Sequence, residues 1–361
     1  MKKPARNPAG VRHNAGLKLG DQRAHHRFGI RARLLTASLL ACLLVAGSAC
    51  NLVHKSVEVE KLLTPLSSAS TQDLIAQVNR LANVKSIHGK VDIQFEDTSF
   101  ATAGIAEKYR AADGSITLQR PAKVYLVVQG PLAIGDVAQM TSDGEHFRIA
   151  VLKGDEKYRR FVRGTNNAIY QKLNGESTNP DPKGKPTNEA QAVKALSNLR
   201  PQHLTDALLL RPIDGQGFLY ARSEFFNSEK DPTSKKRVVR GYYLLDEIQT
   251  GTDGSARLRR RFWFDRVGGI RLARQQNFDD QGALVTDVSF GDIRNFGSAG
   301  TVQLPVQVSL TRPQDHYKIT MTYQTPESVT IDRDWPAEAF VLENKWQLPE
   351  VDLDVQKSPT R

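Results

Sequence analysis

RPAKVYLVVQGPLAIGDVAQMTSDG, residues 120–144, holds two apolar runs on either side of a Gly-Pro step. The runs over 123–129 and 136–141 are short and rich in apolar residues, which is typical of strands, and Gly-Pro favours a turn between them. The stretch therefore predicts a hairpin. Its tip is unusual, because Leu132 and Ile134 stand where a turn is ordinarily polar.

Similar strands follow along most of the chain. Val91, Ile93 and Phe95 alternate with polar residues, as expected for a strand with one buried and one solvent-exposed face. Further strands are expected near residues 103–110, 115–119, 146–152, 157–163, 217–222, 237–248, 257–265, 270–278, 283–291, 304–311, 316–323 and 328–332. The separating turn signals are Asp113-Gly114, Asp143-Gly144, Asp253-Gly254, Gly268-Gly269 and Gln281-Gly282. Such short links predict hairpins, so the expected fold is mainly β, a large curled antiparallel sheet with a few helices.

Two regions interrupt the strands and predict helices. Residues 70–73 form a capping box, and apolar residues from Leu74 to Ala82 then recur at three-and-four spacing. The strand pattern also stops between 164 and 216, where a polar loop precedes an apolar stripe from Val193 and, after Pro201, a short helix over 204–209. Each helix needs an apolar surface to cover.

The basic character of the chain is concentrated at its start. The 361 residues carry a net charge of +11, and residues 1–33, with nine Lys or Arg and one acid, supply +8 of it, which leaves +3 for the rest. So small a charge argues against nucleic-acid binding. The uncharged run over 34–49 follows the basic leader and is shorter than the roughly 20 residues of a membrane span, so it predicts a signal peptide.

The run ends in Gly47-Ser48-Ala49-Cys50, which resembles a bacterial lipobox and makes Cys50 the expected lipidation site. Leu39-Leu40-Ala41-Cys42 is the rival motif, but it would leave an apolar region of only about five residues against the usual 7 to 15. An ordinary signal peptide cleaved near Ala49 is the remaining alternative. Acylated Cys50 would anchor the protein to a membrane.

Catalytic and metal-binding motifs are missing from the sequence. It has no GxSxG, HExxH, GxxxxGK[ST] or GxGxxG pattern, and both of its cysteines lie in the leader. His88, His146 and His316 are each expected at the beginning of a strand, where a surface histidine is commoner than a metal ligand. The sequence therefore predicts no enzyme, no cofactor and no metal site.

This organisation resembles the LolA/LolB family of outer-membrane lipoprotein carriers. DGSITLQRPAKVYLVV is similar to the LolA strand that ends in Arg-Pro, and the resemblance implies that Arg120 holds the lid helices shut. VYLVVQGPLAIGD is similar to the LolB segment with a protruding Pro-Leu-Gly tip, which places Pro131 and Leu132 in a membrane-contact loop, although Ala133 stands where LolB has Gly. NLRPQHLTDALL resembles the mid-chain lid helices, and the meander after residue 259 resembles the later strands.

The resemblance implies a half-open β-barrel with a helical lid and an apolar basin for acyl chains. By alternation, the side chains predicted to line this cavity are Val91, Ile93, Phe95, Val124, Leu126, Val128, Phe147, Ile149, Phe262, Phe264, Val308, Ile319 and Met321. A fully packed core without a cavity is the alternative. The expected divisions are 1–49 signal peptide, 50–69 lipidated cysteine and tether, 70–345 LolA/LolB-like domain with an insertion over 164–216, and 346–361 polar tail.

The sequence hypothesis is a lipoprotein anchored to the outer membrane and facing the periplasm. It would bind the acyl chains of lipoproteins or lipids, accept them from a LolA-like donor and help transfer them to the membrane, with no bond chemistry. An RseB-like envelope-stress sensor, a structural envelope lipoprotein without ligand and a glycolipid carrier are the alternatives. The RseB family adds a small C-terminal domain, and the last 16 residues, WQLPEVDLDVQKSPTR, are too short and polar to be one.

Overall fold

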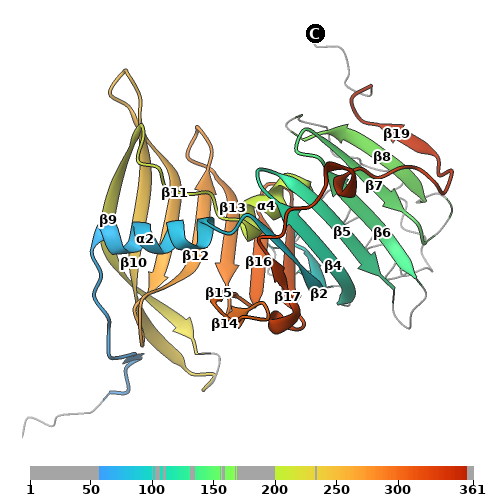
Figure 1. Cartoon of the computed structure of the whole chain (residues 1–361). Helices are drawn as coiled ribbons and strands as arrows, with labels where there is room; N and C mark the ends of the chain where they lie inside the picture. The colour runs from blue at the N-terminus through green and yellow to red at the C-terminus, as the bar shows by residue number, and fades with distance from the viewer. Residues whose placement is uncertain are drawn as a thin grey trace, which may run out of the picture. The chain divides into compact units, whose positions relative to one another are not determined.

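Strand β2 (Ser86–Asp97) is the centre of the fold. In the computed structural model it pairs antiparallel with β17 (Tyr317–Tyr323) on one side and with β4 (Ala112–Gln119) on the other (Figure 1). Strands from the beginning and the end of the fold thus meet along β2.

The structure describes residues 57–99, 101, 106–108, 111–130, 135–154, 156, 159–166, 168, 200–231 and 234–355. The chain divides into two units, Met1–Val59 and Glu60–Arg361, and every element below belongs to the second.

The sheet extends in both directions from β2. Beyond β4 lie β5 (Lys123–Gln129), β6 (Asp136–Ser142), β7 (His146–Val151) and β8 (Arg160–Thr165), each antiparallel to the previous strand. Beyond β17 lie β16 (Gln307–Arg312), β13 (Leu284–Phe290), β12 (Arg271–Phe278), β11 (Ala256–Asp265), β10 (Arg237–Thr250) and β9 (Phe218–Lys230), again antiparallel. The predicted antiparallel meander is confirmed.

Short elements complete the 17-stranded sheet of the described residues. They are β1 (Lys61–Leu62), parallel to β10, β3 (Glu107–Lys108) and β18 (Thr330–Ile331), both antiparallel to β2, and β19 (Glu350–Asp352), parallel to β8. A separate hairpin consists of β14 (Ile293–Phe296) and β15 (Val302–Pro305). Two 3₁₀ turns, η4 (Pro326–Ser328) and η5 (Ala337–Phe340), follow β17.

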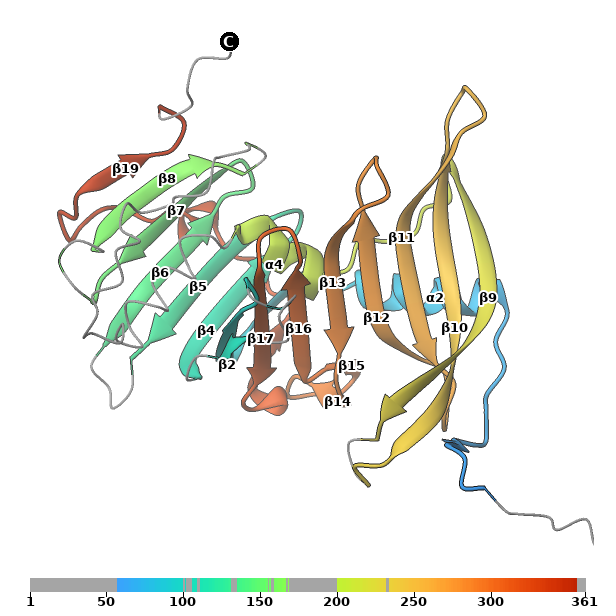
Figure 2. The ribbon, with the colours of Figure 1, turned by 180° about the vertical axis from the view of Figure 1, so that it is seen from behind.

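The sheet is curled but open. Seen from the two opposite sides in Figures 1 and 2, it bends from β9 at one end to β8 and β19 at the other. Among the described residues no strand pairing joins these two ends, so the sheet does not close into a barrel. The predicted fold class, mainly β with a curled antiparallel sheet and few helices, is therefore confirmed.

Among the described residues, two α-helices cover the inner face of the sheet. Helix α2 (Thr71–Ala82) begins at the predicted capping box, in which the Ser70 hydroxyl accepts from the Asp73 amide and the Asp73 carboxylate accepts from the Ser70 amide. Its buried residues Leu74, Val78 and Ala82 belong to the predicted stripe, and Ile75 and Leu81 of that stripe are half-buried. Helix α4 (Pro201–Leu208) has Pro201 in its first turn, where a missing N–H costs nothing.

The structure departs from the sequence expectation at Asp113-Gly114, which is not a turn. Both residues lie within β4, where Gly114 is opposite Val91 and Val128. A Cβ on Gly114 would lie 2.5 Å from the Val127 carbonyl oxygen, so glycine is needed here for close packing of strands rather than for a bend.

The fold also reaches beyond residues 70–345. β1 lies in the expected tether and β19 in the expected polar tail, and Leu66 forms an isolated bridge with Val267. Pairings of two or three residues are too short to show a period in the sequence.

The expected strand over 304–311 is divided between β15 and β16, because Pro305 has no amide to continue a ladder.

Removing the N-cap of α2 tests how much this helix depends on it. Ser70→Ala leaves the first-turn amides without their acceptor, and we expect a loss of about 1 kcal/mol in the free energy of unfolding. The measurement is urea unfolding of the full chain followed by circular dichroism. Ser68→Ala, two residues earlier at an exposed position, is the control, and equal losses in the two variants would contradict a capping role for Ser70.

Candidate functional site

The inner face of the sheet is strongly apolar. Twelve of the thirteen side chains predicted to line a basin are buried, and Phe95 is half-buried. The registers place them against one another, since Ile319 is opposite Phe95, and Met321 is opposite both Ile93 and Val308. These residues therefore share one face, as alternation predicted.

This apolar face is divided into two cores. The cluster under helix α4, here the α4 core, contains the predicted residues of β2, β5, β7, β16 and β17 together with Leu204, Ala207 and Leu209. The cluster under helix α2, here the α2 core, contains Phe262 and Phe264 with Leu74, Val78, Leu210 and Ile213. Eleven of the thirteen predicted residues thus belong to or contact the α4 core, and two belong to the α2 core.

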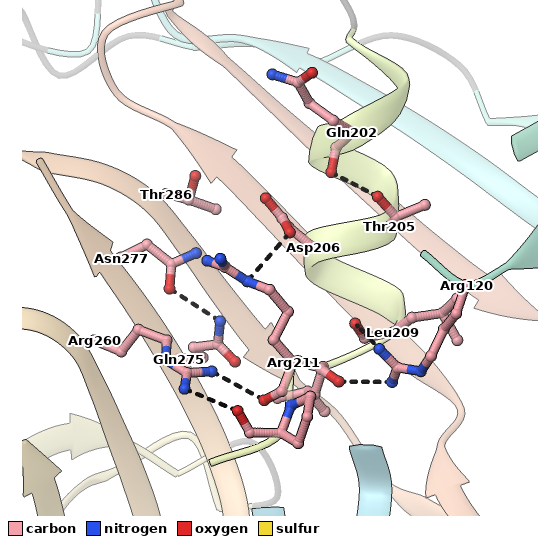
Figure 3. Close-up of polar contacts among 12 residues, drawn as sticks. Arg120, Gln202, Thr205, Asp206, Leu209, Arg211, Arg260, Gln275, Asn277 and Thr286 are labelled. Carbon is pink, nitrogen blue, oxygen red and sulfur yellow. Dashed lines mark hydrogen bonds and ion pairs between the residues drawn. The ribbon is translucent and has the colours of Figure 1, made fainter. Parts of the chain in front are cut away.

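A polar row lies on the same face beside these cores. Glu247, Arg260, Asn277 and Thr286 are successive cross-strand neighbours on β10, β11, β12 and β13. Gln275, next on this face of β12, donates to Asn277 Oδ1 at 3.0 Å (Figure 3). These five residues are called the polar row below. The sequence gives little sign of this row, because Arg260 lies among neighbouring arginines and Gln275 and Asn277 lie in a run of polar residues.

Arg120 lies at the end of β4 and points toward the segment that follows α4. Its Nη2 donates to the Leu210 carbonyl at 2.6 Å, its Nη1 to the Leu209 carbonyl at 3.5 Å, and its Nε to the Val84 carbonyl at 2.8 Å (Figure 3). Burial lowers the pKa of Arg120, whereas the charge of Asp332 acts in the opposite direction. Arginine stays charged in proteins, so these hydrogen bonds are charge-assisted.

Residues 209–213, here the strap, connect α4 to the loop before β9. A second arginine holds the next two carbonyls, because Arg260 donates to Arg211 O at 2.9 Å and to Pro212 O at 3.1 Å (Figure 3). Arg260 is also bidentate to Glu247, with both nitrogen–oxygen distances 2.6 Å. The sequence does contain a sign of this role for Arg260. In RRRFWFD, Arg260 stands two residues before Phe262, so both side chains lie on the same face of the strand.

Helix α2 completes the attachment of the strap. Asn79 donates from Nδ2 to the Ile213 carbonyl at 3.0 Å and accepts from the Ile213 amide at 2.7 Å. Every backbone carbonyl from Leu209 to Ile213 therefore accepts a hydrogen bond from a side chain. The lid, defined as α4 plus the strap, is fixed to the sheet by polar contacts at its C-terminal end.

Helix α4 is also fixed by a buried histidine. His203 Nδ1 lies 2.7 Å from the Tyr317 hydroxyl of β17, and both side chains are buried. Burial, with the charges of Arg312 and Arg200, lowers the pKa of His203 to about 2. The imidazole is thus neutral in the folded protein at neutral and mildly acidic pH.

A groove of about 540 Å³ opens beside Arg120. It lies between the C-terminal end of α2 and the β14–β15 hairpin, and its walls include Arg80, Leu81, Val84, Leu304 and Asp332. Val84 is shared with the Arg120 contacts. The residues predicted to line a basin do not line this groove.

Several predicted site residues fall outside the described residues. They are the lipidation site Cys50, its rival Cys42, the loop residues Pro131 and Leu132, and the helix expected from Val193. The flanks of the loop are described: β5 and β6 form a hairpin, in which the Gly130 amide donates to the Gly135 carbonyl at 3.1 Å. Residues 131–134 therefore connect the two strands of this hairpin, as predicted.

Within the described ranges, no three or more His, Cys, Asp or Glu side chains are grouped to hold a metal ion. His88 contacts the Thr117 hydroxyl at 2.8 Å, and His146 lies beside Asp143. In that same part of the chain, no helix has the length and apolar character needed to cross a membrane.

Comparison with known proteins gives weak structural overlaps. No family model and no curated protein matches the chain. A DUF1329 family protein from Desulfovibrio piger overlaps with a TM-score of 0.40 and 11% identity, over 75% of this chain and 95% of that one. A LolA superfamily protein from Nitrosomonas europaea overlaps with 0.39 and 10%, over 76% and 99%. An outer membrane lipoprotein-sorting protein domain from Vibrio parahaemolyticus gives 0.39 and 10%, over 75% and 97%.

The buried His203 makes the fold sensitive to acid. In the unfolded chain this histidine binds a proton below its ordinary pKa of 6.5, whereas folded His203, with a pKa of about 2, does not. The free energy of unfolding therefore decreases as the pH is lowered from about 6.5. At about 1.4 kcal/mol per pH unit, the loss between pH 7 and pH 5 is roughly 2 kcal/mol. His203→Gln should lose this part of the pH dependence in urea unfolding of the full chain.

His146→Gln is the matched control, because the side chain of His146 is 55% exposed and does not belong to the α4 core. It should retain the pH dependence of the wild type. A His203→Gln variant that is destabilised by acid as much as the wild type would show that the buried histidine is not responsible.

Proposed function

We propose that this protein binds the acyl chains of lipoproteins or lipids against the inner face of its curled sheet and helps to transfer them at the bacterial cell envelope. The observation that carries this proposal is the construction of the lid. An eight-residue helix, α4, covers a wide apolar face, and Arg120 holds the strap behind it through hydrogen bonds to backbone carbonyls. Such a lid can be exchanged for an apolar guest without breaking a covalent bond.

The magnitudes favour this exchange. Each buried CH₂ of an acyl chain contributes about 0.8 kcal/mol, so a chain of about fifteen methylenes gains roughly 12 kcal/mol. The hydrogen bonds that Arg120 donates contribute about 1.5–3 kcal/mol each, a net value that already allows for the water that replaces them. The apolar contacts that Leu204 and Ala207 lose are taken over by the guest. An acyl chain therefore supplies enough free energy to displace the lid.

The groove beside Arg120 is the proposed entrance. Its volume of about 540 Å³ falls in the range of ordinary ligand sites, roughly 300–1,000 Å³. Leu81, Val84 and Leu304 supply apolar walls, and Arg80 and Asp332 supply polar ones. A guest with an acyl chain and a polar head matches this mixed lining, and it would meet the Arg120 contacts as it enters.

Anchoring and delivery complete the proposal. Acylated Cys50 would hold the protein at the outer membrane facing the periplasm, and a LolA-like donor would supply the cargo. Leu132, in the connection between β5 and β6, would touch the bilayer, where burial of a leucine side chain contributes roughly 1.5–3 kcal/mol. No enzymatic step and no cofactor is involved.

Native mass spectrometry of the full chain, purified from membranes in mild detergent, tests the proposal directly. We expect a co-purified acyl ligand, and its mass distinguishes an acylated peptide from a phospholipid or a glycolipid. A full chain that carries no ligand and also refuses a fluorescent fatty acid would favour a structural or sensor role and overturn the carrier proposal.

Arg120→Leu tests the gate. Loss of the guanidinium removes two strap contacts and raises the fraction of molecules with an open lid, so the apparent affinity for a fluorescent fatty acid should rise by roughly 5- to 30-fold. Arg163→Leu, which removes an exposed arginine paired with Asp352, is the control and should leave the affinity unchanged. If Arg120→Leu binds the probe as the wild type does, Arg120 does not gate the site.

Leu132→Glu tests delivery. A charge at the loop should slow transfer of the bound fluorescent fatty acid from the full chain to phospholipid vesicles at least several-fold, with unchanged probe affinity, because glutamate does not enter the bilayer interior. Gln129→Glu, at the exposed end of β5, places the same charge beside the loop as a control. Transfer by Leu132→Glu at the wild-type rate would exclude the loop from membrane contact.

A further inference from the structure

The two ends of the strap are attached by different kinds of contact. At the first end, Arg120 reaches Leu209 and Leu210, and one of these two bonds is long, at 3.5 Å. No carboxylate in the described part of the chain pairs with Arg120, and Asp332 acts on it only at a distance. When this end opens, the guanidinium can exchange backbone carbonyls for water and leave no buried charge behind.

The second end is held by a buried ion pair. Arg260 and Glu247 are 8% and 3% exposed, they are bidentate, and Tyr220 donates a further hydrogen bond to Glu247 at 3.1 Å. The pair with Glu247 keeps the guanidinium in place, so lifting the strap here would leave two of its N–H groups without their acceptors beside a buried carboxylate, which is unfavourable. Asn79 fixes the neighbouring Ile213 through both of its backbone groups. This end has no low-cost way to open.

The side chains of the strap change core between these two ends. Leu209 belongs to the α4 core, whereas Leu210 and Ile213 belong to the α2 core. A movement that releases Leu209 uncovers the α4 core, and the α2 core stays closed as long as Ile213 remains attached. The division between a movable and a fixed part therefore falls between Leu210, the last residue whose carbonyl Arg120 holds, and Arg211, the first whose carbonyl Arg260 holds.

We propose that Arg260, held by Glu247, is a positioning residue that fixes the hinge of the lid, and that the lid opens only from its Leu209 end. The inference rests on the proposed function in taking this opening as the event that admits a ligand. It assigns the ligand to the α4 core, formed by β2, β4 to β8 and β13 to β17. Phe262 and Phe264, although predicted as cavity residues, belong to the fixed half and do not contact the ligand.

Two amides report separately on the two ends. The Leu209 amide donates to Thr205 O at 2.8 Å, and the Ile213 amide donates to Asn79 Oδ1 at 2.7 Å. Hydrogen–deuterium exchange of the ligand-free full chain, resolved to single residues by mass spectrometry, measures both. We expect Arg120→Leu to speed exchange at Leu209 by at least tenfold and to leave Ile213 protected. Glu247→Gln, which keeps the side-chain volume, should speed exchange at Ile213 by at least tenfold.

Arg261→Leu is the matched control for the second end. Arg261 is bidentate to Asp246 at 2.6 and 2.7 Å, one residue from Arg260 in sequence and on the opposite face of β11, and it does not contact the strap. It should change neither amide. Arg260→Lys, which keeps the charge but not the fork, should behave like Glu247→Gln, and circular dichroism establishes that each variant is folded.

Two outcomes would contradict the hinge. The first is an equal increase in the exchange rate of both amides in Arg120→Leu, which would mean that the strap opens as one piece. The second is an unchanged exchange rate of the Ile213 amide in Glu247→Gln. Because these measurements use no ligand, they are independent of the carrier proposal. A parallel titration with a fluorescent fatty acid tests that proposal alone. A chain that binds no fatty acid yet shows the asymmetric exchange retains the hinge and loses the carrier function.

Discussion

The dominant constraint on this structure is a wide apolar face with little helix to cover it. The sheet continues from β9 to β8 and β19 without closing, and the two α-helices of the described residues contain twelve and eight residues. A helix rises about 1.5 Å per residue, so α4 spans about 12 Å. Two separate cores are the consequence, one under each helix, since neither helix is long enough to serve both.

The strap between these cores carries backbone groups that neither core can satisfy. A buried carbonyl without a donor is costly, and five successive strap carbonyls need donors where no strand or helix supplies them. Arginine suits this position, because one planar guanidinium serves two adjacent carbonyls. Two arginines and an asparagine, each from a different element, hold the strap. The lid is thus positioned by side chains and not by a continuous hydrogen-bond ladder, which allows one end to move without unfolding the sheet.

Much of the sheet could be predicted from the sequence, because alternation and turn residues are local signals. β5, β6, β7, β10, β11 and β12 begin or end within about two residues of expectation, and the capping box of α2 is where Ser70 and Asp73 indicated. Long-range features could not be predicted the same way. The pairing of β2 with β17 and the contacts of Arg260 with the strap join residues far apart in the chain, and no local pattern encodes them. Arg120 was found through a resemblance, whereas Arg260 needed only the observation that an arginine can share a face with Phe262.

On the outer face of the sheet, β10 to β13 are held mainly by polar contacts, whereas β7 and β8 carry a small apolar cluster of Ala150 and Phe161 that Leu342 and Leu348 cover. There the side chains of β10 to β13 form ion pairs across strands: Arg261 with Asp246, and Arg274 with Asp287. Trp263 lies among them, with the Arg274 guanidinium 5.0 Å from its ring centroid and its indole nitrogen bonded to Gln276. Cross-strand ion pairs stabilise the strands without requiring a cover. These four strands therefore need no cover on their outer face. Arginines serve both faces: on the outer face they pair with a neighbouring strand, while on the inner face Arg260 makes the same bidentate contact with Glu247 of β10 and also holds two strap carbonyls.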